Sequence, residues 1–237
     1  MLNKKITILL FLIVSIFGVG FYVQKDKSTS RNYSGGRHTF SNIDPESYWV
    51  VINKDKPLNP LNYAPTNLVT PNLPLRSNIT DQEKQVEYGT SLALEKMKQA
   101  AASENIGIDL QSGFRSYEFQ KRLYGNYTEK QGQSQANSYS AKPGFSEHQT
   151  GFAVDIGGTS NPDCNVRKCF ADTAEAKWLE NNAHKYGFII RYPKDKQDIT
   201  GYAYEPWHFR YTGEYLAALM KSGNAQTLEE YFKDSQD

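Results

Sequence analysis

The first stretch of the chain is almost uniformly apolar, and its pattern differs from that of every later segment. Lys4 and Lys5 precede a run from Ile6 to Val23 that only Thr7, Ser15 and two glycines interrupt. At about 1.5 Å per helical residue, such a run nearly spans a hydrocarbon core about 30 Å thick. Flanking lysines favour the cytoplasmic side, so the rest of the chain is expected outside the membrane. We therefore predict a membrane anchor in residues 1–23, with a cleaved signal peptide as the alternative.

Polar residues dominate the next segment, residues 24–44. It carries serines, glycines and charges without an apolar period, which predicts a flexible tether. His38 falls in this tether and is expected to be solvated. The folded domain is then expected over residues 45–237, on the outer side of the membrane.

Short apolar runs after the tether predict the strands of the domain. They occupy residues 48–52, 106–114, 150–156, 188–190 and 207–211. In the third run Phe152, Val154 and Ile156 share one face, whereas Ala153 and Asp155 lie on the other.

Helical signals lie between and after these runs. The predicted helices cover residues 80–103, 117–130 and 173–186, followed by a helical tail after Gly213. The first opens with the capping box Thr80–Glu83, and Ser116 and Thr173 are placed to cap the next two. Helices and antiparallel-looking strands alternate irregularly. This order predicts an α+β fold with a small, mostly antiparallel sheet and flanking helices.

Composition and charge narrow the classes of function. Hydrophobic residues make up 38% of the chain and charged residues 22%, which excludes a disordered chain. Lys plus Arg number 27 and Asp plus Glu number 26, so no strong net field attracts nucleic acid. A partner must therefore be recognised by local chemistry.

The chain has two cysteines, Cys164 and Cys169. In an exported protein, so close a pair predicts a disulfide that closes a small loop. A metal site would need further soft ligands in that segment, and it has none. Two free thiols are the other alternative, because spacing does not reveal Cβ geometry.

Two histidines, His148 and His208, each stand near a carboxylate in a strand context. If the two strands are neighbours, both histidines and Asp155 converge on one sheet face. Two imidazoles and one carboxylate form a ligand set for catalytic zinc and leave the fourth position for water. Glu205, just before the last strand, would then take the proton from that water. A single histidine on a strand is more often structural, but two matching contexts among four histidines favour a metal site. His184, on the predicted helix that ends before Gly187, lacks such a context and is expected to be structural.

Three motifs, in this order along the chain, resemble a known family. Ser112–Ser116 fits S-G-[FY]-R-S, Ser146–Asp155 fits S-x-H-x-x-G-x-A-x-D, and Glu205–His208 fits E-x-W-H. Together they resemble the VanY-type D-alanyl-D-alanine carboxypeptidases and their LdcB-type L,D-carboxypeptidase relatives, over about residues 48–235. The resemblance implies the LAS, hedgehog-like peptidase fold with one zinc ion on the sheet face. It also implies a bacterial enzyme that removes the C-terminal D-alanine from peptidoglycan stem peptides.

Carried over position by position, the resemblance implies a role for each matched residue. They are the zinc ligands His148, Asp155 and His208, the base Glu205, the substrate-facing Arg115, and two candidates for holding the terminal carboxylate, Ser146 and Gln120. A guanidinium can stabilise an oxyanion or bind a carboxylate through paired hydrogen bonds. The cysteine pair is not part of this pattern.

The resemblance leaves more than one reaction open. The L,D reaction on tetrapeptides is the preferred expectation, because Phe114–Glu118 with Gln120 is somewhat closer to the L,D type. The D,D reaction on pentapeptides is the alternative. A third possibility is an endopeptidase that cuts within the stem peptide, but its substrate would have no terminal charge for Arg115 to bind. A zinc-containing cell-wall binding module is the alternative from another class, but it would need neither Glu205 nor Arg115. The expected partners are stem peptides and, through the N-terminal segment, the membrane. We expect a monomer at the bacterial cell surface.

Overall fold

The computed structural model describes residues 41–234. The anchor predicted for residues 1–23 and most of the tether predicted for residues 24–44 lie outside this range. None of the helices between residues 41 and 234 has the length and apolarity that crossing a bilayer requires.

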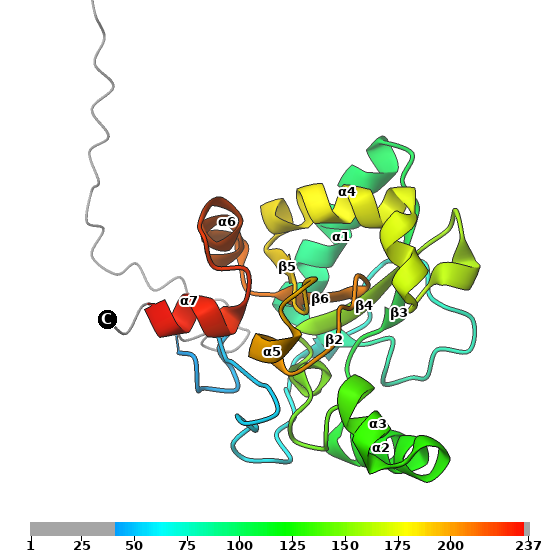
Figure 1. The fold of residues 1–237 in the computed structure, drawn as a ribbon. Coiled ribbons are helices and arrows are strands. Elements are labelled where there is room, and N and C mark those ends of the chain that lie inside the picture. Colours follow the sequence, from blue (N-terminus) through cyan, green and yellow to red (C-terminus); the bar gives the residue numbers. More distant parts are fainter. Residues whose placement is uncertain (1–40, 235–237) are drawn as a thin grey trace, which may run out of the picture. The chain divides into compact units, whose positions relative to one another are not determined.

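A four-stranded sheet in the order β3-β4-β6-β5 forms the centre of the domain (Figure 1). All three of its pairings are antiparallel, and β1 and β2 form a separate antiparallel ladder. The strands are β1 Leu68–Val69, β2 Val86–Glu87, β3 Ile108–Ser112, β4 Ala153–Gly158, β5 Phe188–Ile190 and β6 His208–Tyr211. The predicted α+β class with a small antiparallel sheet is confirmed.

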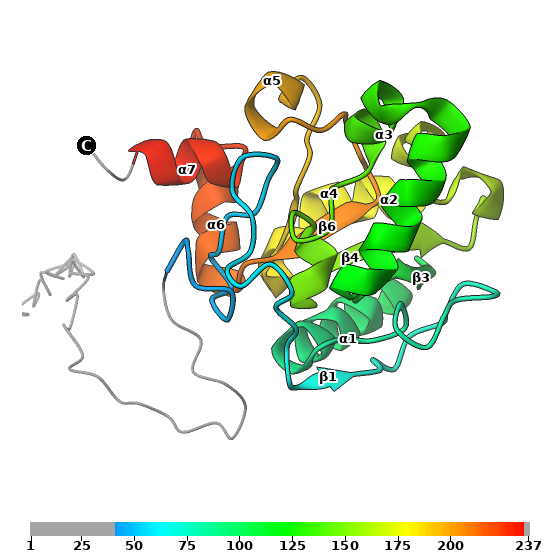
Figure 2. The same cartoon turned by 90° about the horizontal axis from the view of Figure 1, so that it is seen from below.

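Helices lie on both sides of the sheet. In Figure 1, α1 and α4 lie above it and the hairpin of α2 and α3 lies below; Figure 2 views the same hairpin from below. The α-helices are α1 Tyr88–Ser103, α2 Tyr117–Gln131, α3 Gln133–Tyr139, α4 Ala174–Asn182, α5 Gln197–Thr200, α6 Glu214–Ser222 and α7 Leu228–Asp234. The short 3₁₀ helices are η1 Glu147–Thr150, η2 Pro162–Cys164, η3 Lys168–Asp172 and η4 Ala183–Tyr186.

The larger hydrophobic core lies between one face of the sheet and helices α1 and α4. Leu94 and Met97 of α1, Val154 and Ile156 of β4, and Leu179 of α4 are all fully buried in it. Full burial of such a side chain stabilises the fold by about 1.5–3 kcal/mol. Because strand side chains alternate, this packing turns the residue between Val154 and Ile156 toward the opposite face.

Residues 48–52, predicted to form a strand, are turns and extended coil instead. Val50, Val51 and Ile52 are nevertheless buried, and the carbonyl groups of Tyr48, Val50 and Ile52 accept hydrogen bonds from arginine side chains rather than from a neighbouring strand. Arg210 Nη2 donates to Tyr48 O at 3.1 Å and to Val50 O at 2.9 Å. Arg191 Nη2 donates to Ile52 O at 3.3 Å. Apolar pattern alone cannot distinguish these two ways of satisfying a buried backbone.

The first predicted helix begins later than its capping box suggests. The box forms, since Glu83 N donates to Thr80 Oγ1 at 3.2 Å and Thr80 N to Glu83 Oε2 at 3.3 Å. It caps a single turn, after which the chain extends to pair with β1. Helix α1 starts at Tyr88, and its N-cap is Glu87, whose carboxylate accepts from Thr90 N at 2.9 Å.

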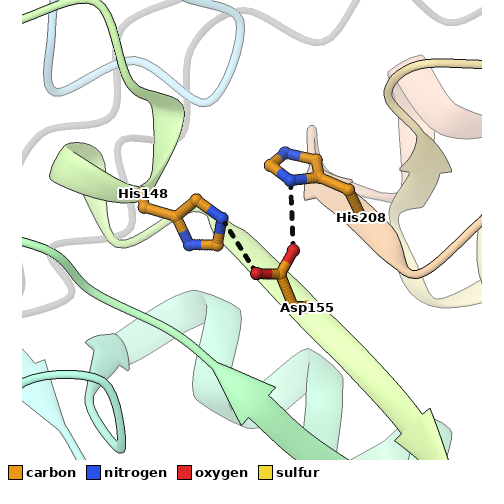
Figure 3. Close-up of side chains that lie close together, drawn as sticks. All are labelled: His148, Asp155 and His208. Carbon is orange, nitrogen blue, oxygen red and sulfur yellow. Dashed lines mark ion pairs between the residues drawn. The ribbon is translucent and has the colours of Figure 1, made fainter. Parts of the chain in front are cut away.

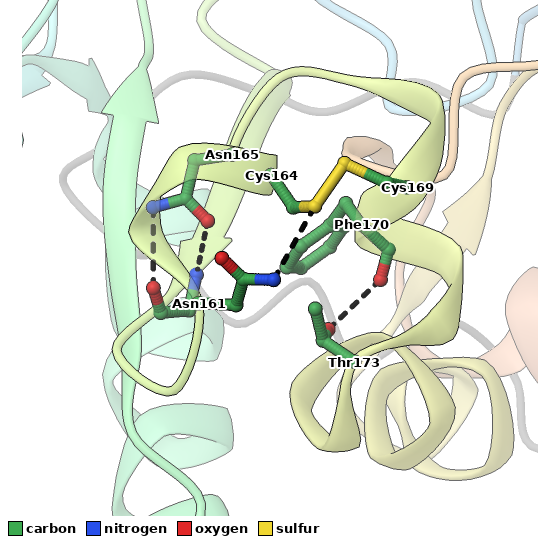
Figure 4. Close-up of a disulfide and its surroundings, with 7 residues drawn as sticks. Asn161, Cys164, Asn165, Cys169, Phe170 and Thr173 are labelled. Atoms are coloured by element: carbon green, nitrogen blue, oxygen red, sulfur yellow. Dashed lines mark hydrogen bonds between the residues drawn. A yellow bond between two sulfur atoms is a disulfide. The ribbon is translucent and has the colours of Figure 1, made fainter.

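The loop after β4 is closed by a disulfide between Cys164 and Cys169 (Figure 4). Asn165 fastens this loop to the end of β4: it accepts from Gly158 N at 2.9 Å and donates to Gly158 O at 3.2 Å. On the other side of the loop, Thr173 accepts from Ala176 N at 3.1 Å and caps α4. The loop is therefore held at both of its ends.

Candidate active site

Three metal-ligating side chains meet on the sheet face opposite the large core (Figure 3). Strands β4 and β6 pair so that Asp155 lies directly opposite His208, and Asp155 Oδ1 is 3.2 Å from His208 Nδ1. His148 comes from the 3₁₀ turn before β4, and its Nε2 is 3.4 Å from Asp155 Oδ2. Gly151 makes the turn from η1 into β4 with φ 73°, and a Cβ there would lie 2.7 Å from Glu87 N. A glycine is therefore required where the chain passes from His148 to Asp155.

The donor atoms of this cluster fit a metal ion. One donor atom from each of His148, Asp155 and His208 lies within 4.8 Å of the other two, and all three residues are buried. His148 Nδ1 contacts Gly113 O at 2.7 Å, which leaves Nε2 to coordinate a metal ion. Within residues 41–234, buried His148 Nε2 and Asp155 Oδ1 have no hydrogen-bond partner. Two imidazoles and one carboxylate match the ligand set of catalytic zinc.

The electrostatics of the cluster also favour a cation. Burial lowers the pKa of His148 to about 4, so this ring is neutral and able to ligate. Burial acts in the same sense on His208, but the carboxylates of Asp155 and Glu147 outweigh it and raise the pKa to about 9. The surrounding carboxylates thus favour a positive charge at His208. A proton supplies this charge in the absence of metal, and a bound metal ion would replace that proton.

Glu205 lies beside the three ligands. Its Oε2 is 3.7 Å from His208 Nδ1, and 12% of its side chain is exposed. The loop before β6 fixes it, because Glu205 N donates to Tyr192 O at 3.1 Å and Glu205 O accepts from His208 N at 3.2 Å. Burial, helped by the charge of Asp155 and opposed by His208 and Arg115, raises the pKa of Glu205 to about 7. A carboxylate with this pKa can both accept and return a proton near neutral pH.

Arg115 and Ser146 line a cleft whose other walls include His148, Glu205 and His208. Arg115 Nη2 is 3.4 Å from Asp155 Oδ2, and Arg115 N donates to His148 O at 3.2 Å. The guanidinium keeps a buried Nε–H that has no hydrogen-bond partner within residues 41–234. That donor is available to an oxyanion or a carboxylate in the cleft.

Gln120 also lines the cleft, but its hydrogen-bonding differs from the sequence-based expectation. Its Nε2 donates to Ser140 Oγ at 3.2 Å and to Ala141 O at 2.8 Å, so both amide hydrogens are in use. Its Oε1 is buried without a partner among the described residues. This amide oxygen can accept a hydrogen bond from an N–H group. It cannot bind a carboxylate, because an amide oxygen and a carboxylate are both acceptors.

Sequence reasoning missed the charged residues behind His208. Glu147 is fully buried and forms ion pairs with Arg191 and Arg210, which are also fully buried. It also missed two tyrosines of the cleft. The rings of Tyr192 and His208 have centroids 4.8 Å apart, and the buried Tyr202 hydroxyl lacks a partner within the described residues. The available signal for the two arginines was a charged residue within or next to an apolar strand pattern. The sequence around the two tyrosines carries no comparable signal.

Comparisons with known proteins agree with this geometry. The family model of VanY, D-alanyl-D-alanine carboxypeptidase, matches residues 83–214. YodJ of Bacillus subtilis (strain 168), a carboxypeptidase by name, is 42% identical over 198 residues, which are 84% of this chain and 71% of that protein.

Solved structures give the same result. The LdcB LD-carboxypeptidase superposes with a TM-score of 0.75 at 42% identity, covering 80% of this chain and 87% of that one. The vancomycin-resistance D,D-pentapeptidase VanY, solved as a glutamate-to-alanine variant in complex with Zn(II), superposes with a TM-score of 0.62 at 29% identity. That alignment covers 78% of this chain and 98% of the VanY chain.

Proposed function

This chain belongs to the VanY family of D-alanyl-D-alanine carboxypeptidases, and from that premise we propose that it cleaves the terminal D-alanine from stem tetrapeptides by an L,D reaction. It is a metallo-carboxypeptidase of peptidoglycan peptides. The observation that carries the hydrolytic chemistry of the proposal is the buried cluster of His148, Asp155 and His208 with Glu205 and Arg115 beside it.

Each residue of the site has a role in the proposed reaction. His148, Asp155 and His208 would hold Zn²⁺, which when bound supplies Lewis acidity and lowers the pKa of water to about 7. Glu205 accepts the proton of the attacking water and returns it to the departing amine of D-alanine. Arg115 donates to the oxygen on which negative charge develops, or to the terminal carboxylate.

The preference for the L,D reaction rests on similarity. Both the identity and the TM-score are higher for the LdcB LD-carboxypeptidase than for the D,D-pentapeptidase VanY. The D,D reaction on pentapeptides is the second candidate, since the family model carries that name.

The proposal also places the domain outside the membrane, with residues 1–23 as its anchor. The apolar run behind Lys4 and Lys5 supports this, and so does the disulfide, because disulfides persist in oxidising compartments. Detection of the intact chain in washed membranes would support the anchor, and a shortened chain in the medium would refute it.

Turnover of defined muropeptides tests the reaction. The wild-type protein should release one alanine from the tetrapeptide, and a chelator should abolish this. The Glu205→Gln variant should lose about 10²–10⁴-fold in kcat while it still binds zinc, because it removes the base and no ligand. Release from the pentapeptide that stops at the tetrapeptide would instead establish the D,D reaction. Zinc binding with no turnover of either peptide would favour a binding module, and full activity of Glu205→Gln would refute the assigned base.

A further inference from the structure

We propose that Glu147 is a positioning residue that orients His208 and fixes which of its ring nitrogens carries the proton. The inference rests on the proposed metal site, because it concerns the nitrogen of His208 that faces away from that site. It assigns a role to a fully buried carboxylate that is not one of the three proposed metal ligands.

The carboxylate of Glu147 is anchored through one of its two oxygens. Oε1 accepts from Arg191 Nε at 2.7 Å and from Arg210 Nη1 at 2.6 Å, and all three side chains are fully buried. Two charge-assisted hydrogen bonds to one oxygen fix the orientation of the carboxylate. Its other oxygen is thereby directed elsewhere.

That second oxygen faces His208. Glu147 Oε2 lies 3.6 Å from His208 Nε2, and neither atom has a hydrogen-bond partner within residues 41–234. The separation exceeds a good hydrogen bond by about half an ångström, so the two atoms are neighbours without being hydrogen-bonded. An unpaired buried acceptor and an unpaired buried ring nitrogen therefore face one another.

The arginines do not need this second oxygen. Arg191 is also bound by both carboxylate oxygens of Glu229, at 2.9 Å and 2.7 Å. Arg210 Nη2 donates to the carbonyl oxygens of Tyr48 and Val50, at 3.1 Å and 2.9 Å. Two arginines and two glutamates balance in charge, so Oε2 of Glu147 is left as an acceptor for His208.

The opposite nitrogen of His208 belongs to the metal cluster, since Nδ1 lies 3.2 Å from Asp155 Oδ1. A ligating imidazole nitrogen must present its lone pair, so the ring proton must reside on Nε2. An acceptor facing that nitrogen selects the required tautomer and fixes the ring plane. His148 has the same arrangement in reverse, with Nδ1 against Gly113 O at 2.7 Å and Nε2 toward Asp155.

The variant Glu147→Gln tests this without a change of shape. Both arginines can only donate, so they require the amide oxygen at the position of Oε1. The amide NH₂ then takes the position of Oε2 and donates to His208 Nε2. This favours the tautomer with its proton on Nδ1, the nitrogen that must ligate. We expect the dissociation constant for zinc, measured by competition with a chromogenic chelator, to rise about 10–100-fold.

The variant Glu229→Gln is the matched control. It alters the same buried charge cluster through Arg191 but does not contact His208, so it should lower stability and leave the zinc dissociation constant within about 2-fold of wild type. Equal zinc affinity in wild type and Glu147→Gln would overturn the positioning role. Equal loss in both variants would also overturn it, because the effect would then be general to the cluster. Failure of the wild type itself to bind zinc would refute the proposed metal site instead.

Discussion

Replacement of Arg191 by methionine measures how strongly the fold depends on the charges behind the site. The Arg191 guanidinium joins three segments that are distant in sequence: it binds Glu147 in η1, Glu229 in α7 and the carbonyl of Ile52. Methionine retains a long apolar stem but donates no hydrogen bond. The substitution therefore leaves the carboxylate of Glu229 largely buried without its cation and removes one of the two cations from Glu147.

The expected cost follows from this burial. Removing one partner of a buried ion pair destabilises a protein by about 3–5 kcal/mol, because the remaining charge stays desolvated. In a domain of 150–250 residues, 1 kcal/mol shifts the melting temperature by about 2–4 °C. Arg191→Met should therefore lower the melting temperature by about 6–20 °C.

Denaturant unfolding at pH 7 measures the same quantity directly, and Lys196→Met is its control. Lys196 pairs with Glu230 of the same helix α7 at 2.7 Å, but both side chains are 23% exposed. Partly exposed pairs contribute about 0–1 kcal/mol. A loss in Arg191→Met no larger than that in Lys196→Met would refute the reasoning. Addition of Glu229→Gln to Arg191→Met should recover part of the loss, because it removes the stranded charge.

Two further predictions concern stability at the other end of β4. Burial raises the pKa of Asp109, although a hydrogen bond from Gln111 opposes this, so its ionised form costs stability and the fold gains stability as pH falls through the folded-state pKa. Asp109→Asn should accordingly be more stable than wild type at pH 7, and the difference should shrink toward pH 3 in unfolding measured across that range; a constant difference would contradict this sign. Replacement of Cys164 and Cys169 by serine should cost about 2 kcal/mol, from the chain entropy of a six-residue loop, and calorimetry of the oxidised wild type against the double variant checks it.

The meeting of the metal ligands could be predicted because strand side chains alternate. Val154 and Ile156 had to face the core, so Asp155 had to face the other way. The same alternation turned Phe209 toward the core and its neighbour His208 toward the face that carries Asp155. For Asp155 and His208 only the pairing of the two strands was missing from that argument, and the structure supplies it. His148 lies in the 3₁₀ helix η1, where strand alternation does not apply. The helix caps at Ser116 and Thr173 were likewise local, and both form as predicted.

The charged cluster behind His208 could not be predicted, because its contacts are long-range. Glu147 is 44 residues from Arg191 and 63 from Arg210 along the chain. Local pattern indicates that an arginine between Phe209 and Tyr211 is unusual, but it does not identify the carboxylate that compensates it. The same limit explains the error at residues 48–52, whose carbonyl groups bind these arginines.

The two faces of strands β4 and β6 therefore differ in what they contribute. On one face Val154 and Ile156 pack against α1 and α4, and each such side chain stabilises the fold by about 1.5–3 kcal/mol. On the other face Glu147, Arg191 and Arg210 form a fully buried ion cluster, and the desolvation of such a cluster offsets much of its pairing energy. An apolar cluster of equal volume would serve stability as well, but it could not present an acceptor to His208 Nε2. Geometry at the metal ligand, rather than stability, is the property that this buried cluster provides.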